Sequence, residues 1–426
     1  MKATLDQAVL SNLSQLLFKY QQIRNHTEEI CEPLQAEDYV VQPVVDVSPP
    51  KWHLGHTTWF FENFILKNNL PDYKLFDDDY HFLFNSYYEH EGERWQRANR
   101  GLLSRPWVNE VKAYRKYVDE HMGYFLSGDH DVSEFVEEAL TIGMNHEQQH
   151  QELLVYDLKH ILGINPLFPT YKSFHGATYV PNLEANYLEI DEGKYKIGHE
   201  GVAFSFDNEL GAHNVFLHRY RILDRLITAG EYLEFINDGG YQDFRHWLME
   251  GWEWVKKEEA RAPFYWLEKN EKWHYYTLAG LEEINLDEPI THINFYEADA
   301  FAKWKGKRLP TEFEWEVACK AFEPQIPEEA NFVEKKNFRP MPRKGNHTQF
   351  YGDVWEWTNS AYLPYPFYEK AEGALGEYNG KFMVNQMVLR GGSLATPKDH
   401  IRATYRNFFH PHLRWQFTGI RLAENF

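Results

Sequence analysis

Apolar residues in the first 164 positions recur with the period of a helix. In four stretches they return about every 3.6 residues, which predicts helices that each turn one face to a core. The four predicted helices are residues 5–31, 51–67, 107–126 and 133–163. Ser48, followed by Pro49 and Pro50, predicts the start of the second helix with serine as its cap, and residues 68–106 predict a long loop. Four helices of this length predict an all-α four-helix bundle.

The pattern changes after residue 164. Residues 165–182 hold three prolines and show no helical period, so they predict a linker between domains. Further along, short strand-like segments at 187–197 and 204–222 are followed by predicted helices at 296–304 and 312–321. We therefore expect a helical domain at 1–164, a linker at 165–182 and an α+β domain at 183–426.

The balance of charge narrows the class of partner. The 426 residues include 64 acidic and 44 basic side chains, a net charge of −20, which argues against a nucleic-acid partner. No apolar run reaches the length of a membrane span. The two cysteines, Cys31 and Cys319, show no metal or redox spacing. We expect a cytoplasmic protein without a disulfide framework, and the sequence leaves homo-oligomerisation open.

The fourth predicted helix carries the clearest chemistry, the string Asn145–Glu152 with histidines at 146 and 150. Imidazoles four residues apart lie one turn apart on a helix, so both can meet one metal ion. A hydrogen-bonded core pair would show the same spacing. The string also matches H-E-x-x-H, in which Glu147 would be the base of a zinc protease. Glu152 and Asp157 are candidates to hold the second nitrogen of a ligand histidine.

A third ligand is expected on the second predicted helix, which offers His53 and His56. Gly55 predicts the close approach of a bulky group beside His56 and favours that residue. The sequence leaves His53, or neither histidine, as alternatives. Three neutral imidazoles can hold either zinc or ferrous iron, so the motif does not identify the metal.

The predicted loop at 68–106 adds phenols and arginines. Tyr87 and Tyr88 are either packing residues or donors of a proton to an activated oxygen. Arg94, Arg97 and Arg100 form either a solvated face or a receptor for a substrate carboxylate.

Motifs from both halves of the chain together resemble a known family. In the first half they are Ser48-Pro49-x-x-Trp52-x-Leu54-x-His56, Phe84-Asn85-Ser86-Tyr87-Tyr88 and His146-x-x-x-His150-x-Glu152. In the second half they are the strings at 308–316, 352–357, 389–393 and 419–423. The first set resembles the ergothioneine-type sulfoxide synthases, and the second resembles the formylglycine-generating-enzyme-like fold.

This resemblance implies a DinB-like four-helix bundle followed by a C-type-lectin-related α+β domain that contributes to the substrate pocket. It implies a non-haem Fe(II) enzyme that uses O2 to join the sulfur of cysteine to C2 of the imidazole of hercynine, with oxidation of the sulfur to a sulfoxide. The implied iron ligands are His56, His146 and His150. The paired tyrosines Tyr87 and Tyr88 imply the branch of the family that uses free cysteine.

The resemblance also implies residues that bind the trimethylated substrate. Aromatic faces suit a trimethylammonium group, which has no hydrogen to donate, and amides suit a carboxylate. The implied residues are Gln149, Asn407, Phe408, Phe409 and Trp415. Without the resemblance, the paired phenylalanines would indicate ordinary packing.

Other functions stay open at this point. A selenoneine synthase, which would join hercynine to a selenosugar, is expected to share the ligands and the hercynine pocket. A zinc hydrolase would depend on Glu147, and a binding module without activity would need none of these groups. Formylglycine generation is not expected, because that chemistry uses a late pair of cysteines and no cysteine follows Cys319.

Overall fold

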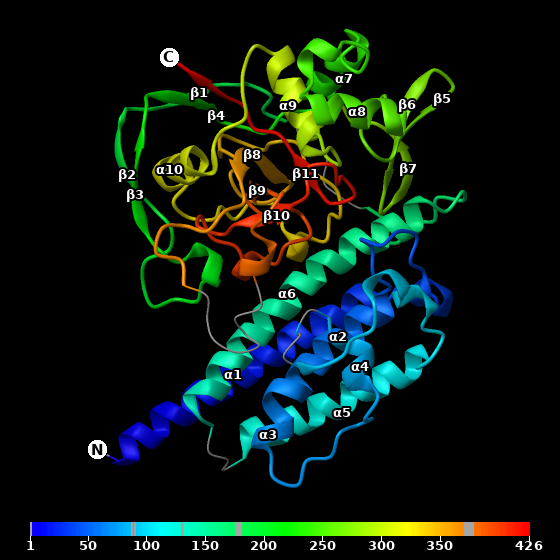
Figure 1. Cartoon of the computed structure of the whole chain (residues 1–426), viewed down its shortest axis with the longest axis vertical. Coiled ribbons are helices and arrows are strands. Elements are labelled where there is room, and N and C mark those ends of the chain that lie inside the picture. Colours follow the sequence, from blue (N-terminus) through cyan, green and yellow to red (C-terminus); the bar gives the residue numbers. More distant parts are fainter. Residues whose placement is uncertain (1, 87, 89–90, 129–131, 175–180, 370–378) are drawn as a thin grey trace. The chain divides into compact units, whose positions relative to one another are not determined.

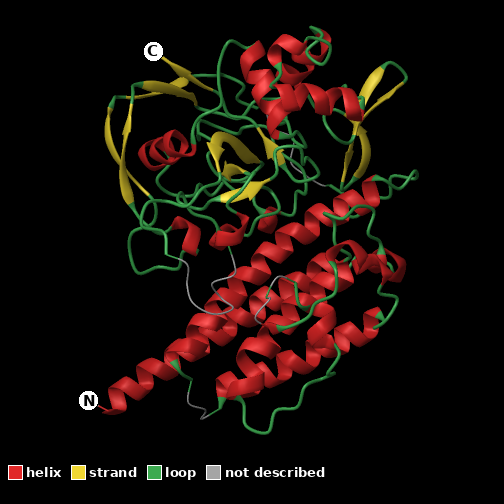
Figure 2. Ribbon diagram, viewed as in Figure 1, coloured by secondary structure: helices red, strands yellow, loops and turns green. Residues whose placement is uncertain are grey.

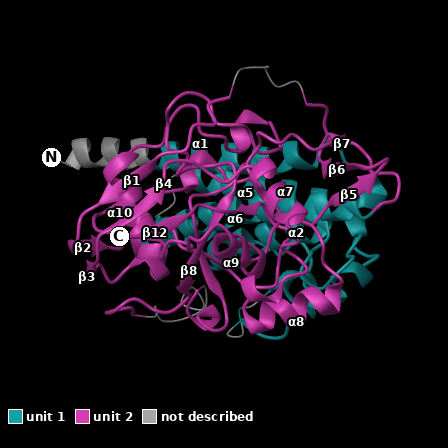
Figure 3. Cartoon of the chain, turned by 90° about the horizontal axis from the view of Figure 1, so that it is seen from above, with its two compact units in different colours: residues 1–164 teal, residues 165–426 magenta. Residues whose placement is uncertain are grey.

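The chain divides into two compact units, residues 1–164 and 165–426 (Figure 3). This computed structural model describes residues 2–86, 88, 91–128, 132–174, 181–369 and 379–426. The first unit is helical, and the second combines short strands with helices and long loops (Figure 2). The prediction of an all-α bundle followed by an α+β domain is confirmed.

The first unit is built on four long helices (Figure 1). They are α1 (Lys2–Cys31), α2 (Pro50–Phe61), α5 (Val108–Ser127) and α6 (Glu134–Gly163). Both α1 and α2 pack against α5 and α6, which produces a four-helix bundle. Ser133 caps α6 by accepting a hydrogen bond from the backbone N–H of Val136, which explains where this helix begins.

Two local predictions in this unit are wrong. Pro49 rather than Ser48 is the N-cap of α2, and Ser48 instead donates its backbone N–H to Asp157. The stretch predicted as one long loop contains ordered short helices, since aromatic side chains there pack onto the bundle. They are α3 (Lys67–Asn69), α4 (Tyr80–Phe84) and a 3-10 helix at Arg97–Leu102. A π-helical segment, Glu62–Leu66, joins α2 to α3, and a further 3-10 helix spans Ala36–Val40.

The second unit contains four small sheets among its described residues. In strand order they are β1-β4-β12, β10-β9-β8-β11, β2-β3 and β5-β6-β7. Only the pairing of β11 with β8 is parallel. The strands are β1 (Tyr187–Ile190), β2 (Gly193–Ile197), β3 (His213–Leu217), β4 (Tyr220–Leu223), β5 (Trp266–Lys269), β6 (Lys272–Thr277), β7 (Gly280–Glu283), β8 (Trp355–Ala361), β9 (Met387–Arg390), β10 (Asn407–Phe409), β11 (Thr418–Gly419) and β12 (Ala423–Asn425).

Three of the four α-helices described in this unit begin at capping boxes. The helices are α7 (Ala229–Asn237), α8 (Met249–Glu258), α9 (Phe295–Trp304) and α10 (Glu312–Phe322). Thr311 and Glu314 cap α10 reciprocally, and Thr228 and Glu231 do the same for α7. The sequence predicted α9 and α10, whereas α7 and α8 were not predicted, although the T-x-x-E pattern at 228–231 is a signal for the start of α7.

Buried ion pairs connect the motifs of the second unit. Arg421 pairs with Glu356 of β8 at 2.7 Å, and Trp315 of α10 donates to the same carboxylate at 2.9 Å. Arg390 of β9 likewise pairs with Glu312 and Glu316 of α10. All of these side chains are buried. The motif strings at 308–316, 352–357, 389–393 and 419–423 therefore connect the sheet that contains β8 and β9 with α10.

Two further features concern the whole chain. No helix among the described residues is both long and apolar enough to cross a membrane. Cys31 and Cys319 are both buried, and burial raises the pKa of the Cys31 thiol to about 12 and that of the Cys319 thiol further still.

Candidate metal centre

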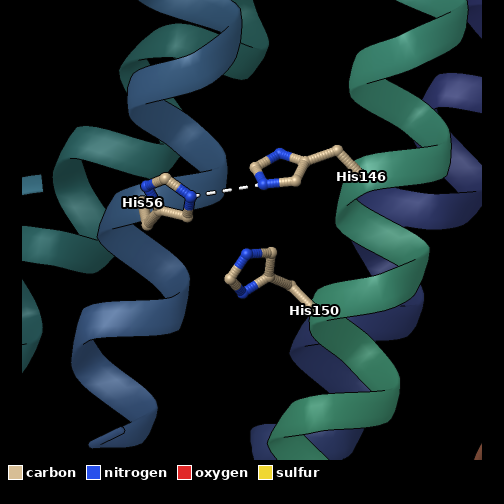
Figure 4. A group of neighbouring side chains, drawn as sticks. All are labelled: His56, His146 and His150. Carbon is tan, nitrogen blue, oxygen red and sulfur yellow. Dashed lines mark hydrogen bonds between the residues drawn. The ribbon is translucent and has the colours of Figure 1, made fainter. Parts of the chain in front are cut away.

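Helices α2 and α6 bring three histidines of the first unit together. His56 projects from α2, and His146 and His150 project from successive turns of α6 (Figure 4). One ring nitrogen of each lies within 4.8 Å of the others. His56 and His146 are buried, and His150 is half-buried. Among the described residues, these three histidines form the one cluster of side chains that could hold a metal ion. They are the three ligands that the resemblance implies.

Two glycines allow the close packing around this group. A Cβ at Gly143 would lie 2.7 Å from the rings of Phe60 and Phe61, so only glycine lets α2 and α6 approach here. A Cβ at Gly55 would lie 2.2 Å from the ring of Phe84. The bulky neighbour that Gly55 predicted is therefore the Phe84 ring.

The backbone of Phe84 also orients His56. The Nδ1–H of His56 donates to the Phe84 carbonyl at 2.6 Å, which leaves the lone pair on Nε2. That Nε2 faces Nε2 of His146 at 3.2 Å, the contact drawn in Figure 4. Two nitrogens that each lie about 2.1 Å from one metal are roughly 3.0 to 3.4 Å apart. The His56–His146 spacing fits a shared ion.

Burial keeps the three imidazoles neutral. It lowers the pKa of His146 to about 4, although the neighbouring Glu147 opposes this. Burial, reinforced by the neighbouring histidines, lowers the pKa of His56 and of His150 well below the usual value. Neutral imidazoles present lone pairs, so the donor set fits a divalent transition ion, iron as well as zinc.

His53, the alternative third ligand, has a different position. Its Nδ1 lies 2.8 Å from Nδ1 of His150, and its Nε2 lies 3.0 Å from Oδ2 of Asp157. His53 therefore contacts a member of the group without belonging to it. Of the two carboxylates considered as supports, Asp157 reaches the group through His53. Glu152 instead accepts a hydrogen bond from Tyr156.

Glu147 is engaged on another side of α6. Arg24 donates to its Oε2 at 2.9 Å, and Arg115 and Thr27 each donate to its Oε1 at 2.6 Å. Burial alone would raise the pKa of this carboxyl, but Arg115 and Arg24 outweigh burial and lower the pKa to about 2. A fully buried carboxylate held by two guanidinium groups binds α1, α5 and α6 together, and this arrangement does not suit the base of a zinc protease.

Aromatic rings flank His56 along α2. Trp52 stacks on His56 with 4.6 Å between ring centroids, and Trp59 is nearly parallel to it at 5.8 Å. The guanidinium of Arg100 lies over Trp52, 3.2 Å from the ring centroid. This stack was not predicted from the sequence, although the spacing of residues 52, 56 and 59 places them on one helical face.

The predicted arginines differ in their surroundings. Arg100 is buried and donates to the hydroxyls of Ser48 and Ser86, both at 2.9 Å. Arg97 is half-buried and donates to the carbonyl of Asp46, and Arg94 is also half-buried. The binding of a substrate carboxylate by these arginines stays a prediction.

Of the two predicted phenols, Tyr87 lies outside the described residues. Tyr88 is buried, and its ring lies 5.5 Å from Trp59 and 5.3 Å from Phe64. The side chain of Asn85 holds its backbone, accepting from the N–H of Tyr88 and donating to its carbonyl. Tyr88 thus packs beside a ring that itself flanks His56.

The substrate residues predicted from the resemblance lie in both units. Gln149 is half-buried on α6, between His146 and His150 in sequence. In the second unit, Asn407, Phe408 and Phe409 form β10, where Phe408 stacks on Tyr362 at 4.1 Å. Phe409 meets the buried Trp415 edge-on at 5.5 Å. The contact of these residues with a substrate stays a prediction.

The two units define a class of protein. Residues 19–154 match the model of the DinB superfamily, and residues 179–426 match that of the sulfatase-modifying factor enzyme 1-like domain. The chain is 30% identical to the hercynine oxygenase of Mycolicibacterium smegmatis over 88% of this chain and 91% of that protein. It is 30% identical to the hercynine oxygenase of Mycolicibacterium thermoresistibile over 67% of this chain and 68% of that protein. A third hercynine oxygenase, from Mycobacterium tuberculosis, is 34% identical over 51% of this chain and 56% of that protein.

The chain belongs to the family of these hercynine oxygenases, the ergothioneine-type sulfoxide synthases.

Proposed function

We propose that this protein is a non-haem, Fe(II)- and O2-dependent sulfoxide synthase of ergothioneine biosynthesis. It joins the sulfur of cysteine to C2 of the hercynine imidazole. The observation that carries the proposal is the convergence of three neutral imidazoles, His56, His146 and His150, in a chain similar over 88% of its length to a hercynine oxygenase.

The reaction balances with one molecule of O2. Hercynine loses the hydrogen at C2 and cysteine loses the thiol hydrogen, and a C–S bond forms between the two. One oxygen atom of O2 enters the product as the sulfoxide, and the other leaves as water with the two hydrogens. The four electrons that O2 accepts come from the C–H and S–H bonds and from the sulfur lone pair.

The proposed iron ligands are His56, His146 and His150. Fe(II) would supply the one-electron chemistry that makes O2 reactive toward the two substrates. The chain supplies three fixed lone pairs, and no carboxylate belongs to the ligand group found among its described residues. Trp52, Trp59 and Phe60 surround the histidines with apolar surface that limits the access of water.

We further propose that a phenol of the Tyr87–Tyr88 pair delivers the proton that accompanies reduction of O2. Tyr88 is buried, and its ring packs beside Trp59 of α2. A phenol that gives up its proton only during reaction acts as a general acid at neutral pH.

For the substrates, we propose that aromatic faces of Phe409 and Trp415 bind the trimethylammonium group and that Gln149 and Asn407 bind the hercynine carboxylate. Phe408 is a further candidate, although its ring already stacks on Tyr362. We propose that the cysteine carboxylate binds among Arg94, Arg97 and Arg100, of which Arg100 donates to two buried hydroxyls.

The test is reconstitution without oxygen. The protein is loaded with Fe(II) anaerobically, hercynine and cysteine are added, air is admitted and the product mass is measured. The proposal expects O2 uptake only with both substrates, and a product equal to their sum plus one oxygen minus two hydrogens. A parallel reaction with a selenosugar in place of cysteine tests the alternative donor. Uptake without hercynine, or no coupled product, would overturn the proposal.

A further inference from the structure

Two consecutive hydrogen bonds connect Asp157, through His53, to His150. Oδ2 of Asp157 lies 3.0 Å from Nε2 of His53, and Nδ1 of His53 lies 2.8 Å from Nδ1 of His150. His53 and Asp157 are each only 2% exposed. Burial of this degree leaves little room for water to compete for the polar atoms of His53 and Asp157.

The carboxylate fixes the direction of each hydrogen bond. A carboxylate oxygen accepts, so the tautomer of His53 that fits this contact carries its hydrogen on Nε2 and donates it to Asp157. Nδ1 of His53 then holds a lone pair and accepts, so Nδ1 of His150 is the donor. The lone pair of His150 is left on Nε2, the nitrogen available to a metal.

Other groups orient the remaining parts of the site. His56 is held by a backbone carbonyl, whereas His150 is held by a side chain from the opposite helix. Asp157 also accepts the backbone N–H of Ser48 at 2.8 Å, next to the first turn of α2. One carboxylate of α6 therefore fixes both the beginning of α2 and the imidazole that this helix presents to His150.

We propose that His53 and Asp157 are positioning residues, which hold His150 as its Nδ1–H tautomer with Nε2 directed to the metal. The inference rests on the metal site of the proposed function and on none of its substrates. The Asp157 carboxylate, through its hydrogen bond with His53, also makes His150 a stronger electron donor than an imidazole held by a carbonyl alone.

The test compares two replacements of His53. Asparagine places an amide oxygen near the position of Nδ1 and still accepts from His150, whereas leucine fills the space and accepts nothing. Affinity for Co(II) is measured by the visible absorption of the bound ion, without substrate. We expect His53→Leu to weaken Co(II) binding by about 10- to 100-fold. We expect His53→Asn to retain most of the affinity and the wild-type spectrum.

His121→Leu is the matched control, because this half-buried histidine of α5 bonds the Tyr117 carbonyl of its own helix and packs against the Tyr73 ring, away from the three clustered histidines. It is expected to bind Co(II) like the wild type. Wild-type affinity in His53→Leu, or an equal loss in both His53 variants, would overturn the proposal.

A second measurement needs no variant. Nitrogen-15 chemical shifts of the metal-free protein distinguish the tautomers of each histidine. The proposal expects His150 to carry its hydrogen on Nδ1 and His53 on Nε2. A hydrogen on Nε2 of His150, or a doubly protonated His53, would contradict it even if His53→Leu failed to fold. Both readouts omit hercynine, cysteine and O2, so failure of the proposed reaction leaves them intact.

Discussion

The indole of Trp52 stacks on the imidazole of His56, with ring centroids 4.6 Å apart and planes inclined by 13°. The guanidinium of Arg100 lies over the same indole, so a permanent charge is buried one ring away from a proposed ligand. The stack fixes the plane of His56, and the hydrogen bond to Phe84 fixes its rotation. Together they set the direction of the Nε2 lone pair before any ion arrives.

Replacement of Arg100 tests what this guanidinium does. Arg100→Met removes a buried cation–π contact and two charged hydrogen bonds, so we expect the free energy of unfolding in urea to fall by about 3 kcal/mol. Arg105→Met is the control, since Arg105 is exposed and lies over Trp107 at 4.6 Å. That change is expected to cost about 0.5 to 1 kcal/mol at most. A stable Arg100→Met protein with only a raised KM for cysteine would instead favour a direct role in substrate binding.

Alanine at any of the three clustered histidines is expected to abolish stoichiometric binding of Fe(II) and, with it, turnover. The wild type should also melt at a higher temperature when metal is added, because an ion that binds only the folded state stabilises it. His56→Ala, His146→Ala and His150→Ala should show no such rise, while His121→Ala should behave like the wild type. Metal analysis and thermal unfolding with and without a chelator make the measurement. Full metal content in any of the three variants would show that the replaced histidine is not a metal ligand.

Glu147 separates an iron synthase from a zinc hydrolase. Glu147→Gln leaves Arg24 and Arg115 without their buried counter-charge, so we expect a loss of about 3 to 5 kcal/mol in the free energy of unfolding. Glu28→Gln is the control, because Glu28 also pairs with Arg115, at 3.5 Å, but its side chain is exposed. It is expected to change stability by less than about 1 kcal/mol. A stable Glu147→Gln protein that lost a peptidase activity of the wild type would support the hydrolase.

Asp353 should make stability depend on pH. Burial raises the pKa of this carboxyl from 3.8 to about 6, against hydrogen bonds from Met341, Asn331 and Gln349. The folded state therefore binds more protons than the unfolded state between pH 3.8 and 6. The stability given by the protonated carboxyl is fully present below pH 3.8 and is lost as the pH rises through 6.

Asp353→Asn is expected to remove this loss. Asparagine is neutral at every pH and tolerates the positive φ of 57° found here. The variant should be more stable than the wild type at pH 7.5, by on the order of 3 kcal/mol at most, and the difference should shrink as the pH falls toward 4. Chemical denaturation at several pH values measures it, with Asp191→Asn, whose side chain is 91% exposed, as control. A difference that is constant with pH would exclude ionisation as its cause.

Helix periodicity predicted the four long helices of the first unit, because these helices carry a continuous apolar face. The predicted helices at 107–126 and 133–163 differ from α5 and α6 by about one residue at each end. In the second unit the elements are short. The hairpins formed by β5, β6 and β7 were not predicted, because so few residues that alternate between apolar and polar cannot be distinguished from a loop. Ser48 was predicted as a cap from its position alone, whereas its contacts with Asp157 and Arg100 cross long stretches of sequence.

The spacing of His146 and His150 predicted a shared direction on α6, and Gly55 correctly indicated a close neighbour beside His56. Spacing could not show what lies opposite each side chain. The H-E-x-x-H pattern is the same whether its glutamate faces a metal or two arginines, and the partners of Glu147 lie 123 and 32 residues away. The bond between His53 and His150 likewise depends on how two distant helices pack.

The two buried thiols bear on how the proposed reaction is followed. An enzyme that oxidises a thiol with O2 exposes its own sulfur atoms to the same chemistry. Here Cys31 and Cys319 stay protonated and enclosed, so neither is a ready nucleophile. A colorimetric thiol reagent added to the folded protein should therefore count only the cysteine that remains in solution, and repeated turnover should not consume the catalyst.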